Sequence, residues 1–169
     1  MSTAAAATVL APAARWSAAR TILIAGCIAG FLDIMYAIIV WAVKGVSPVR
    51  ILQSVAGGLM GRDAWTGGVP TAILGALAHF GISIGAAAVF YWMATRWRLL
   101  TDRPLLSGVC YGFGFYLFMQ YVVLPLSAAP GGGGGNWRLE WMLVGALFAH
   151  TILFGTPIAL LTRHGRRGA

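Results

Sequence analysis

The chain has 169 residues, of which 59% are apolar and only 9% are charged, and its formal net charge is +8. Soluble domains usually contain roughly 25% charged residues, so this composition excludes an ordinary water-exposed surface and indicates a protein that lies in a lipid bilayer. The basic residues lie near the chain ends and between apolar stretches rather than in a stripe interleaved with aromatic residues. This distribution argues against a nucleic-acid partner.

Apolar stretches long enough to cross a bilayer follow an Ala-rich start. Residues 1–20 lack the basic beginning of a signal peptide, and we predict that they form a flexible cytoplasmic tail. Four stretches then reach the length of about 20 residues that a spanning helix needs, at residues 21–43, 70–94, 105–127 and 141–162. We predict an all-α, polytopic four-helix transmembrane domain over residues 21–163, followed by a basic cytoplasmic tail over residues 164–169.

The first connection carries a helix signal of its own. Ser47 precedes Pro48, which is the pattern of an N-cap followed by proline at the first helical position. Apolar residues then recur at helical spacing up to Leu59. We predict a short helix within residues 48–61, which either lies on the outer membrane surface or dips into the bundle as a re-entrant segment. The third connection contains a run of glycines at residues 131–135 and is predicted to be a flexible linker.

Lysine and arginine are unevenly divided between the two sides of the predicted bundle. The N-terminal tail, the second connection and the C-terminal tail together carry more of them than the first and third connections. Because the side richer in these residues faces the cytoplasm, we predict that both termini are cytoplasmic. Tryptophans lie at the span ends or in the flanks, as expected for indole rings at a membrane interface.

Small residues mark two faces for close helix packing. Gly26 and Gly30 are four residues apart on the first span and share a stripe with Asp33, so we expect this face to turn inward. Gly81 and Gly85 have the same spacing on the second span. They lie off the stripe that contains His79, so they are candidates for contact with a partner or a second copy.

Three ionisable residues inside the spans are predicted to form one polar layer. Counted from the outer ends of their spans, Asp33, His79 and His150 lie at similar depths of about 13–15 Å, at 1.5 Å per residue. A charged residue at such a depth costs at least about 2.5 kcal/mol, so these side chains should face the interior. Other polar residues could border the layer: Tyr36, Tyr116 and Gln120.

Several hypotheses remain open for this layer. The one we place first is structural: Asp33 accepts hydrogen bonds that hold the helices in register, in an accessory subunit of a larger membrane complex. In the second, Asp33 loads and releases a proton in a small oligomeric transporter or channel.

A third hypothesis is that His79 and His150 hold haem b, or that Asp33 joins them around a divalent metal such as Zn²⁺ or Fe²⁺. No ligand spacing within one helix supports it, and absence of a cofactor is the default expectation. The chain contains no H-E-x-x-H motif and no nucleophile elbow, so enzymatic activity is not predicted.

Three segments carry a resemblance to known proteins. LQSVAGGL at residues 52–59, followed by GRDA at 61–64 and GG at 67–68, resembles the first connection of a group of small, functionally uncharacterised bacterial inner-membrane proteins. YVVLPLS at 121–127 and LAHF at 77–80 are similar to the same group. The resemblance covers roughly residues 22–160 and implies a bacterial inner membrane and four spans. It implies no activity, ligand or catalytic residue.

Overall fold

A computed structural model describes residues 16–130 and 141–167. Within these ranges the chain is helical, without a strand, and it contains 4 helices that are long and apolar enough to cross a membrane. They are Ala18–Ala42, Gly68–Arg96, Pro104–Leu126 and Met142–Arg166. The predicted four-helix membrane bundle is therefore confirmed, while residues 1–15 and the glycine run at 131–135 fall outside the described ranges.

The first two spans are single α-helices. α1 covers Ala18–Ala42 and begins slightly before the predicted start at residue 21, because the Ser17 hydroxyl accepts a hydrogen bond from the backbone N–H of Arg20 at 3.2 Å. α3 covers Gly68–Arg96 and is followed by α4, a short helix at Leu99–Asp102. The fourth span likewise continues as helix to Arg167, through residues that we predicted to be a tail.

The third and fourth spans each contain a π-helical segment. The third consists of α5 (Pro104–Phe118), π-helical Met119–Val123 and α6 (Leu124–Leu126). The fourth consists of α7 (Trp141–Phe148), π-helical Ala149–Gly155 and α8 (Thr156–Arg167). Each π-helical segment ends two residues before a proline, Pro125 or Pro157. Proline lacks an N–H and its ring clashes with the carbonyl four residues back, so the regular hydrogen-bond pattern cannot run through either position.

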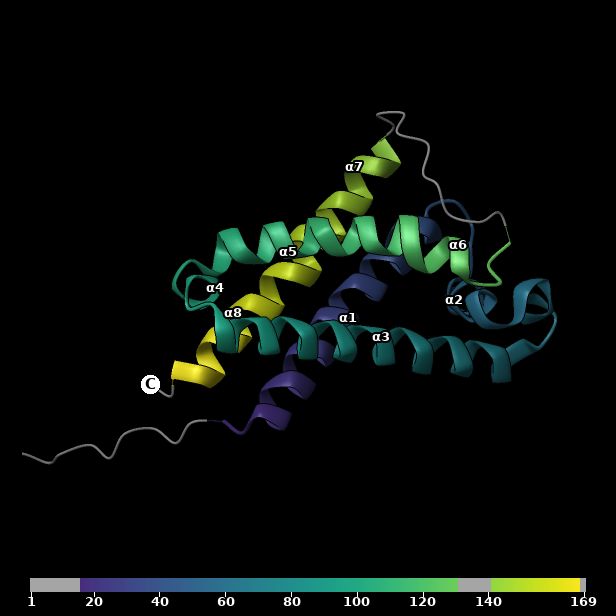
Figure 1. The fold of residues 1–169 in the computed structure, drawn as a ribbon. Helices are drawn as coiled ribbons and strands as arrows, with labels where there is room; N and C mark the ends of the chain where they lie inside the picture. The colour runs from purple at the N-terminus through teal and green to yellow at the C-terminus, as the bar shows by residue number, and fades with distance from the viewer. Residues whose placement is uncertain (1–15, 131–140, 168–169) are drawn as a thin grey trace, which may run out of the picture.

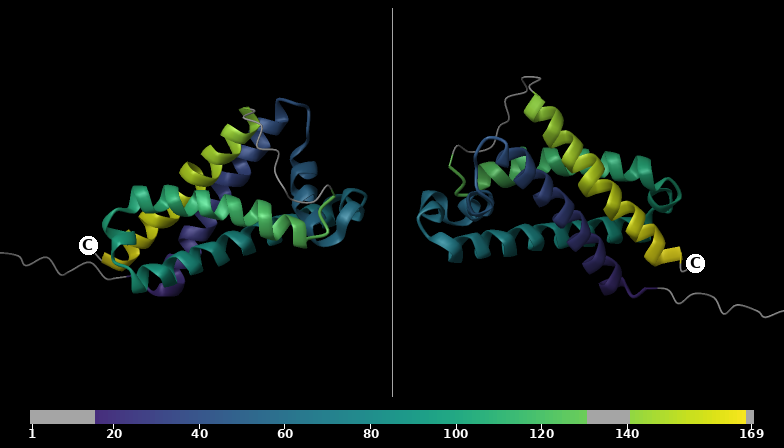
Figure 2. Two further views of the ribbon diagram at one scale, coloured as in Figure 1. Left: turned by 45° about the horizontal axis from the view of Figure 1, so that its top comes forward. Right: turned by 180° about the vertical axis from the view of Figure 1, so that it is seen from behind.

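The four spans form an open ring. α3 packs on α1, α1 packs on the fourth span, and the fourth span packs on α5. α1 and the fourth span run side by side and cross the layer that α3 and α5 form (Figures 1 and 2). α5 and α3 do not pack closely against each other, so the ring stays open between them.

The short helix predicted in the first connection is present and packs on the bundle. α2 covers Pro48–Met60, with Ser47 as its N-cap, and a 3₁₀ turn follows at Gly61–Trp65. The buried Gln53 side chain donates to the Gly68 carbonyl at 3.0 Å and to the Thr71 hydroxyl at 3.2 Å. These bonds fix α2 against the start of α3.

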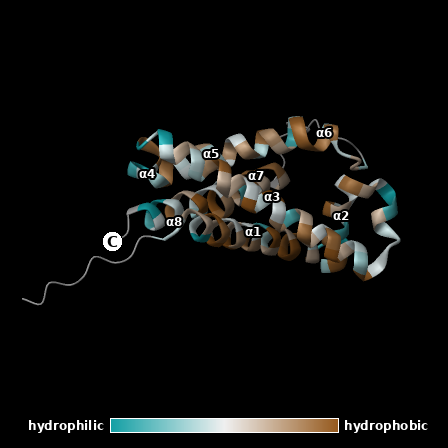
Figure 3. Ribbon diagram, turned by 60° about the horizontal axis from the view of Figure 1, so that its bottom comes forward, coloured by the Kyte–Doolittle hydropathy of each residue, from teal (hydrophilic) through white to brown (hydrophobic). Residues whose placement is uncertain are grey.

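The distribution of side chains suits a lipid environment. The buried residues are mostly small, such as Ala25, Ala29 and Ala87 at 0% exposure, whereas large apolar side chains such as Leu23 and Ile39 are exposed. In water this pattern would leave a large apolar surface, but in lipid it allows backbones to approach closely. Figure 3 shows hydrophobic residues along α1 and α3 and hydrophilic residues near α4, α8 and α2.

Cationic side chains lie over aromatic rings at both ends of the bundle. Arg20 lies 4.9 Å from the Trp16 ring at the end that also holds α4, and Lys44 lies 4.9 Å from the Trp41 ring at the opposite end. Such pairs suit the two membrane interfaces, where an indole ring and a charged head group meet water and lipid together.

Candidate functional site

A cavity of about 270 Å³ lies near the middle of the bundle and is here called the chamber. α1, α2 and α3 and the third and fourth spans all contribute to its walls. Its polar lining residues are Asp33, Ser54, His79, Ser83, Ser127 and His150. The three ionisable residues of the predicted polar layer are thus brought together around one space.

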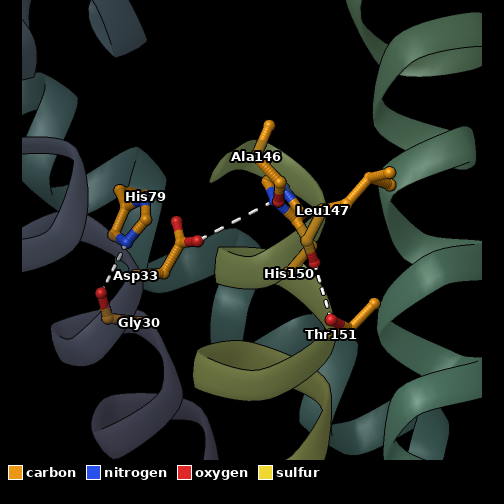
Figure 4. A network of polar contacts seen from close by, with 7 residues as sticks. All are labelled: Gly30, Asp33, His79, Ala146, Leu147, His150 and Thr151. Atoms are coloured by element: carbon orange, nitrogen blue, oxygen red, sulfur yellow. Dashed lines mark hydrogen bonds and ion pairs between the residues drawn. The ribbon is translucent and has the colours of Figure 1, made fainter. Parts of the chain in front are cut away.

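The Asp33 carboxylate lies between the two imidazole rings (Figure 4). Its Oδ1 atom is 4.0 Å from Nδ1 of His150, and the two side chains are 18% and 23% exposed. This separation permits ion pairing but exceeds hydrogen-bond length. Among the described residues, no hydrogen bond reaches the Asp33 carboxylate, so it faces the chamber rather than a fixed partner.

Each histidine hydrogen-bonds a backbone carbonyl through one ring nitrogen. Nε2 of His79 is 2.8 Å from the Gly30 oxygen on α1, and Nδ1 of His150 is 2.9 Å from the Ala146 oxygen on its own helix. A carbonyl oxygen can only accept, so both of these nitrogens carry a hydrogen. In the neutral rings, Nδ1 of His79 and Nε2 of His150 therefore hold lone pairs that can take up a proton.

The π-helical segment positions His150. The widened helix turn carries His150 at its second residue, and π-helical turns are frequent at functional sites. The His150 ring meets Tyr116 edge-on at 5.4 Å and lies 6.4 Å from the ring of Phe115. On the backbone side, the His150 carbonyl is in close contact with Gly112 of α5. Aromatic rings and a glycine contact therefore determine where this imidazole lies.

The three residues predicted to border the polar layer differ from one another in their surroundings. Tyr116 is buried and touches the His150 ring, and Gln120 lies beside Tyr116 one turn further along. Tyr36 lies against Gly145 and the ring of Phe148 on α7. None of the three predicted border residues is among the residues that line the chamber.

Sequence reasoning missed the serines that α2 and the end of the third span contribute. Ser54 and Ser127 reach the chamber because the end of α2 lies against the segment that follows α6, where the Ala128 N–H donates to the Gly58 carbonyl at 2.9 Å. No periodicity within a single segment signals this contact.

The predicted glycine faces have different surroundings. A Cβ at Gly26 would lie 2.6 Å from the backbone of Ile84, and a Cβ at Gly30 would come similarly close to the side chain of Ser83. Both glycines therefore allow α1 and α3 to approach closely. Gly81 and Gly85 have no atom within 4 Å of such a Cβ. Sequence reasoning missed the glycine contacts that join α5 closely to the fourth span: Gly108, Gly112 and Gly155.

The chamber does not suit the cofactors that we considered. Within the described residues, no group of three His, Cys, Asp or Glu side chains is arranged to hold a metal ion. A volume of about 270 Å³ also lies below the range of about 300–1,000 Å³ that is usual for pockets holding drug-sized ligands, and haem is a large ligand. The geometry therefore favours neither the metal hypothesis nor the haem hypothesis.

A second cavity adjoins the chamber. It is an apolar cleft of about 930 Å³ between α3 and α5, at the opening of the ring. Four residues line both cavities: Ile82, Phe115, Met119 and Val123. At its other end the cleft reaches α4 and Arg103.

Comparison with models of protein families, with curated proteins and with solved structures finds no match for this chain. The chemistry of the chamber and the cleft is therefore the basis for a functional proposal.

Proposed function

We propose that the protein is a small proton-conducting membrane transporter in which Asp33, His79 and His150 bind and release the proton. The observation that carries this proposal is the Asp33 carboxylate itself, which lies in a cavity 4.0 Å from an imidazole and accepts no hydrogen bond from the described residues. Such a group is placed to exchange a proton rather than to join helices.

Energetics favour this role over a purely structural one. A charged side chain at mid-membrane costs at least about 2.5 kcal/mol. A structural carboxylate would offset that cost through interhelical hydrogen bonds worth roughly 0.6–2 kcal/mol each. Asp33 forms none with the described residues, so its presence lowers stability and is better explained by function.

The proton has a defined set of acceptors in the chamber. A proton that binds Nε2 of His150 turns the ring into an imidazolium beside the Asp33 carboxylate. Transfer of that proton from Nε2 through water in the chamber to Asp33 leaves both groups neutral, and release from Asp33 restores the starting state. The chamber has room for several water molecules, since each occupies about 30 Å³, and such waters could carry the proton between these groups and the lone pair of His79.

The test is proton flux into vesicles that contain the purified protein. With a pH-sensitive dye trapped inside and an inside-negative potential set by potassium and valinomycin, wild-type protein should acidify the lumen. Asp33→Asn should reduce the flux to the rate of protein-free vesicles, because the amide cannot accept the proton. Asp63→Asn, the same change at an exposed position outside the spans, should leave the flux unchanged.

An accessory role in a larger membrane complex is the second candidate. The exposed Gly81 on α3 supports it, because a second chain has open access to this glycine. Wild-type vesicles that acidify no faster than empty ones would contradict proton conduction and favour this alternative. Equal flux through wild-type protein and Asp33→Asn would exclude Asp33 as the proton carrier.

We also propose a bacterial inner membrane with both termini in the cytoplasm. The resemblance to bacterial inner-membrane proteins supports the location, and the arginines gathered at the α4 end support the orientation: Arg20, Arg96, Arg98, Arg103 and Arg163. Reporter fusions placed after Arg98 and after Ala169 should both give a cytoplasmic signal. A periplasmic signal from either fusion would contradict the orientation.

A further inference from the structure

The cleft between α3 and α5 opens toward the surroundings of the bundle. Its lining is apolar over most of its length, and Tyr111 forms part of its wall by donating a hydrogen bond to the Ala86 carbonyl at 2.7 Å. The Tyr111 ring also meets Phe90 edge-on at 5.0 Å. These contacts bridge the two helices deep in the cleft and leave its outer part open. In a membrane, hydrocarbon chains would fill this space.

Charge is confined to one end of the cleft. Arg103 precedes the first turn of α5 and is exposed, and it is the one charged residue among the described residues that line the cavity. A guanidinium group can bind a phosphate through two parallel hydrogen bonds. Basic pockets between membrane-spanning helices are known to bind anionic head groups.

We infer that the cleft binds an anionic phospholipid, with its phosphate at Arg103 and one acyl chain lying between α3 and α5. One leaflet provides about 15 Å of hydrocarbon, which is half of a core of about 30 Å. At 1.5 Å per residue, a chain of that length runs along about ten residues of helix. Starting from Arg103, it ends near Gly114 and Phe115, where the cleft meets the wall of the chamber.

Two glycines make room for this chain. Gly85 on α3 and Gly114 on α5 both line the cleft, and a Cβ at either position would meet no atom within 4 Å. A larger side chain at these positions would enter the cleft without striking the protein. Small residues here therefore keep open a space that the protein's own side chains could otherwise fill.

Native mass spectrometry of the full-length protein in detergent tests the inference. Phosphatidylglycerol and phosphatidylcholine with identical acyl chains serve as the two probes. We expect the wild type to bind phosphatidylglycerol about fivefold more tightly than phosphatidylcholine. The reason is that one arginine near an anionic head group contributes about 1 kcal/mol. Arg103→Gln should bring the two lipids to equal affinity, and Arg103→Lys should keep the preference.

Filling the cleft gives the second arm of the experiment. Gly85→Leu should weaken the binding of both lipids by about tenfold, which corresponds to 1.4 kcal/mol. Gly81→Leu is the matched control, because Gly81 is exposed on the same helix, has the same open surroundings and does not line the cleft. It should bind lipid like the wild type.

Three results would overturn the inference. Equal affinity of the wild type for both lipids would contradict a head-group site at Arg103. Unchanged lipid binding by Gly85→Leu would place the lipid elsewhere. A wild-type dimer that Gly85→Leu dissociates and Gly81→Leu preserves would identify a second copy of the chain as the occupant.

Discussion

Replacing Gly112 with alanine is expected to destabilise the protein by about 2 kcal/mol or more. A Cβ at this position would overlap the carbonyl oxygen of His150 and would lie 2.8 Å from the Cα atom of Thr151. Both obstacles are backbone atoms, so relief requires the third and fourth spans to move apart. Overpacking of this kind typically costs about 1–3 kcal/mol. Denaturant unfolding of the detergent-solubilised protein measures the change.

Gly114→Ala provides a control two residues further along the same helix. A Cβ there would meet no atom within 4 Å, so alanine should be neutral or stabilise the helix by up to about 1 kcal/mol, through its higher helix propensity. If the two variants lost the same stability, close contact at Gly112 could not be the cause. The comparison thus separates packing from backbone propensity.

Glycine spacing alone could not predict this contact. Gly81 and Gly85 have the same four-residue spacing as Gly108 and Gly112, yet the first pair faces open space and the second pair packs against the fourth span. The spacing indicates that a helix surface permits close approach. Which surface meets a neighbour depends on how the helices are rotated and paired, and one sequence does not specify that.

The bundle itself was predictable because the bilayer limits the possible structures. Spanning segments must be long, apolar and helical, so hydropathy alone located four spans to within a few residues. The π-helical segments were not predicted. Pro125 and Pro157 are visible in the sequence, but a proline can produce a kink as well as a widened turn.

Depth along the membrane normal was easier to predict than rotation about each helix. Counting residues placed Asp33, His79 and His150 at one level, and all three line the chamber. Tyr36 is less than one turn from Asp33, yet it lies against α7 instead. The rise per residue is nearly constant in a helix, whereas the direction in which each side chain points depends on packing.

A second prediction concerns Asp33 and stability. Asp33→Leu should unfold at a higher denaturant concentration than the wild type, with a gain of about 1–3 kcal/mol, and should conduct no protons. Leucine removes a carboxylate that accepts no hydrogen bond from the described residues and fills part of a chamber of about 270 Å³. Replacing buried ionic groups by apolar ones is often neutral or stabilising by about 1–4 kcal/mol. The same denaturant series and vesicle flux assay measure both effects.

His79→Leu should change stability in the opposite direction. The His79 ring donates to the Gly30 carbonyl at 2.8 Å and so links α3 to α1. Losing this bond should cost about 0.6–2 kcal/mol, the range for interhelical hydrogen bonds in membranes. A loss of stability in Asp33→Leu as large as that in His79→Leu would mean that Asp33 also holds helices together, and the case for a functional carboxylate would fail. Opposite signs would show that His79 holds α3 to α1 whereas Asp33 does not stabilise the bundle, which is what the proposed proton-exchange role of Asp33 requires.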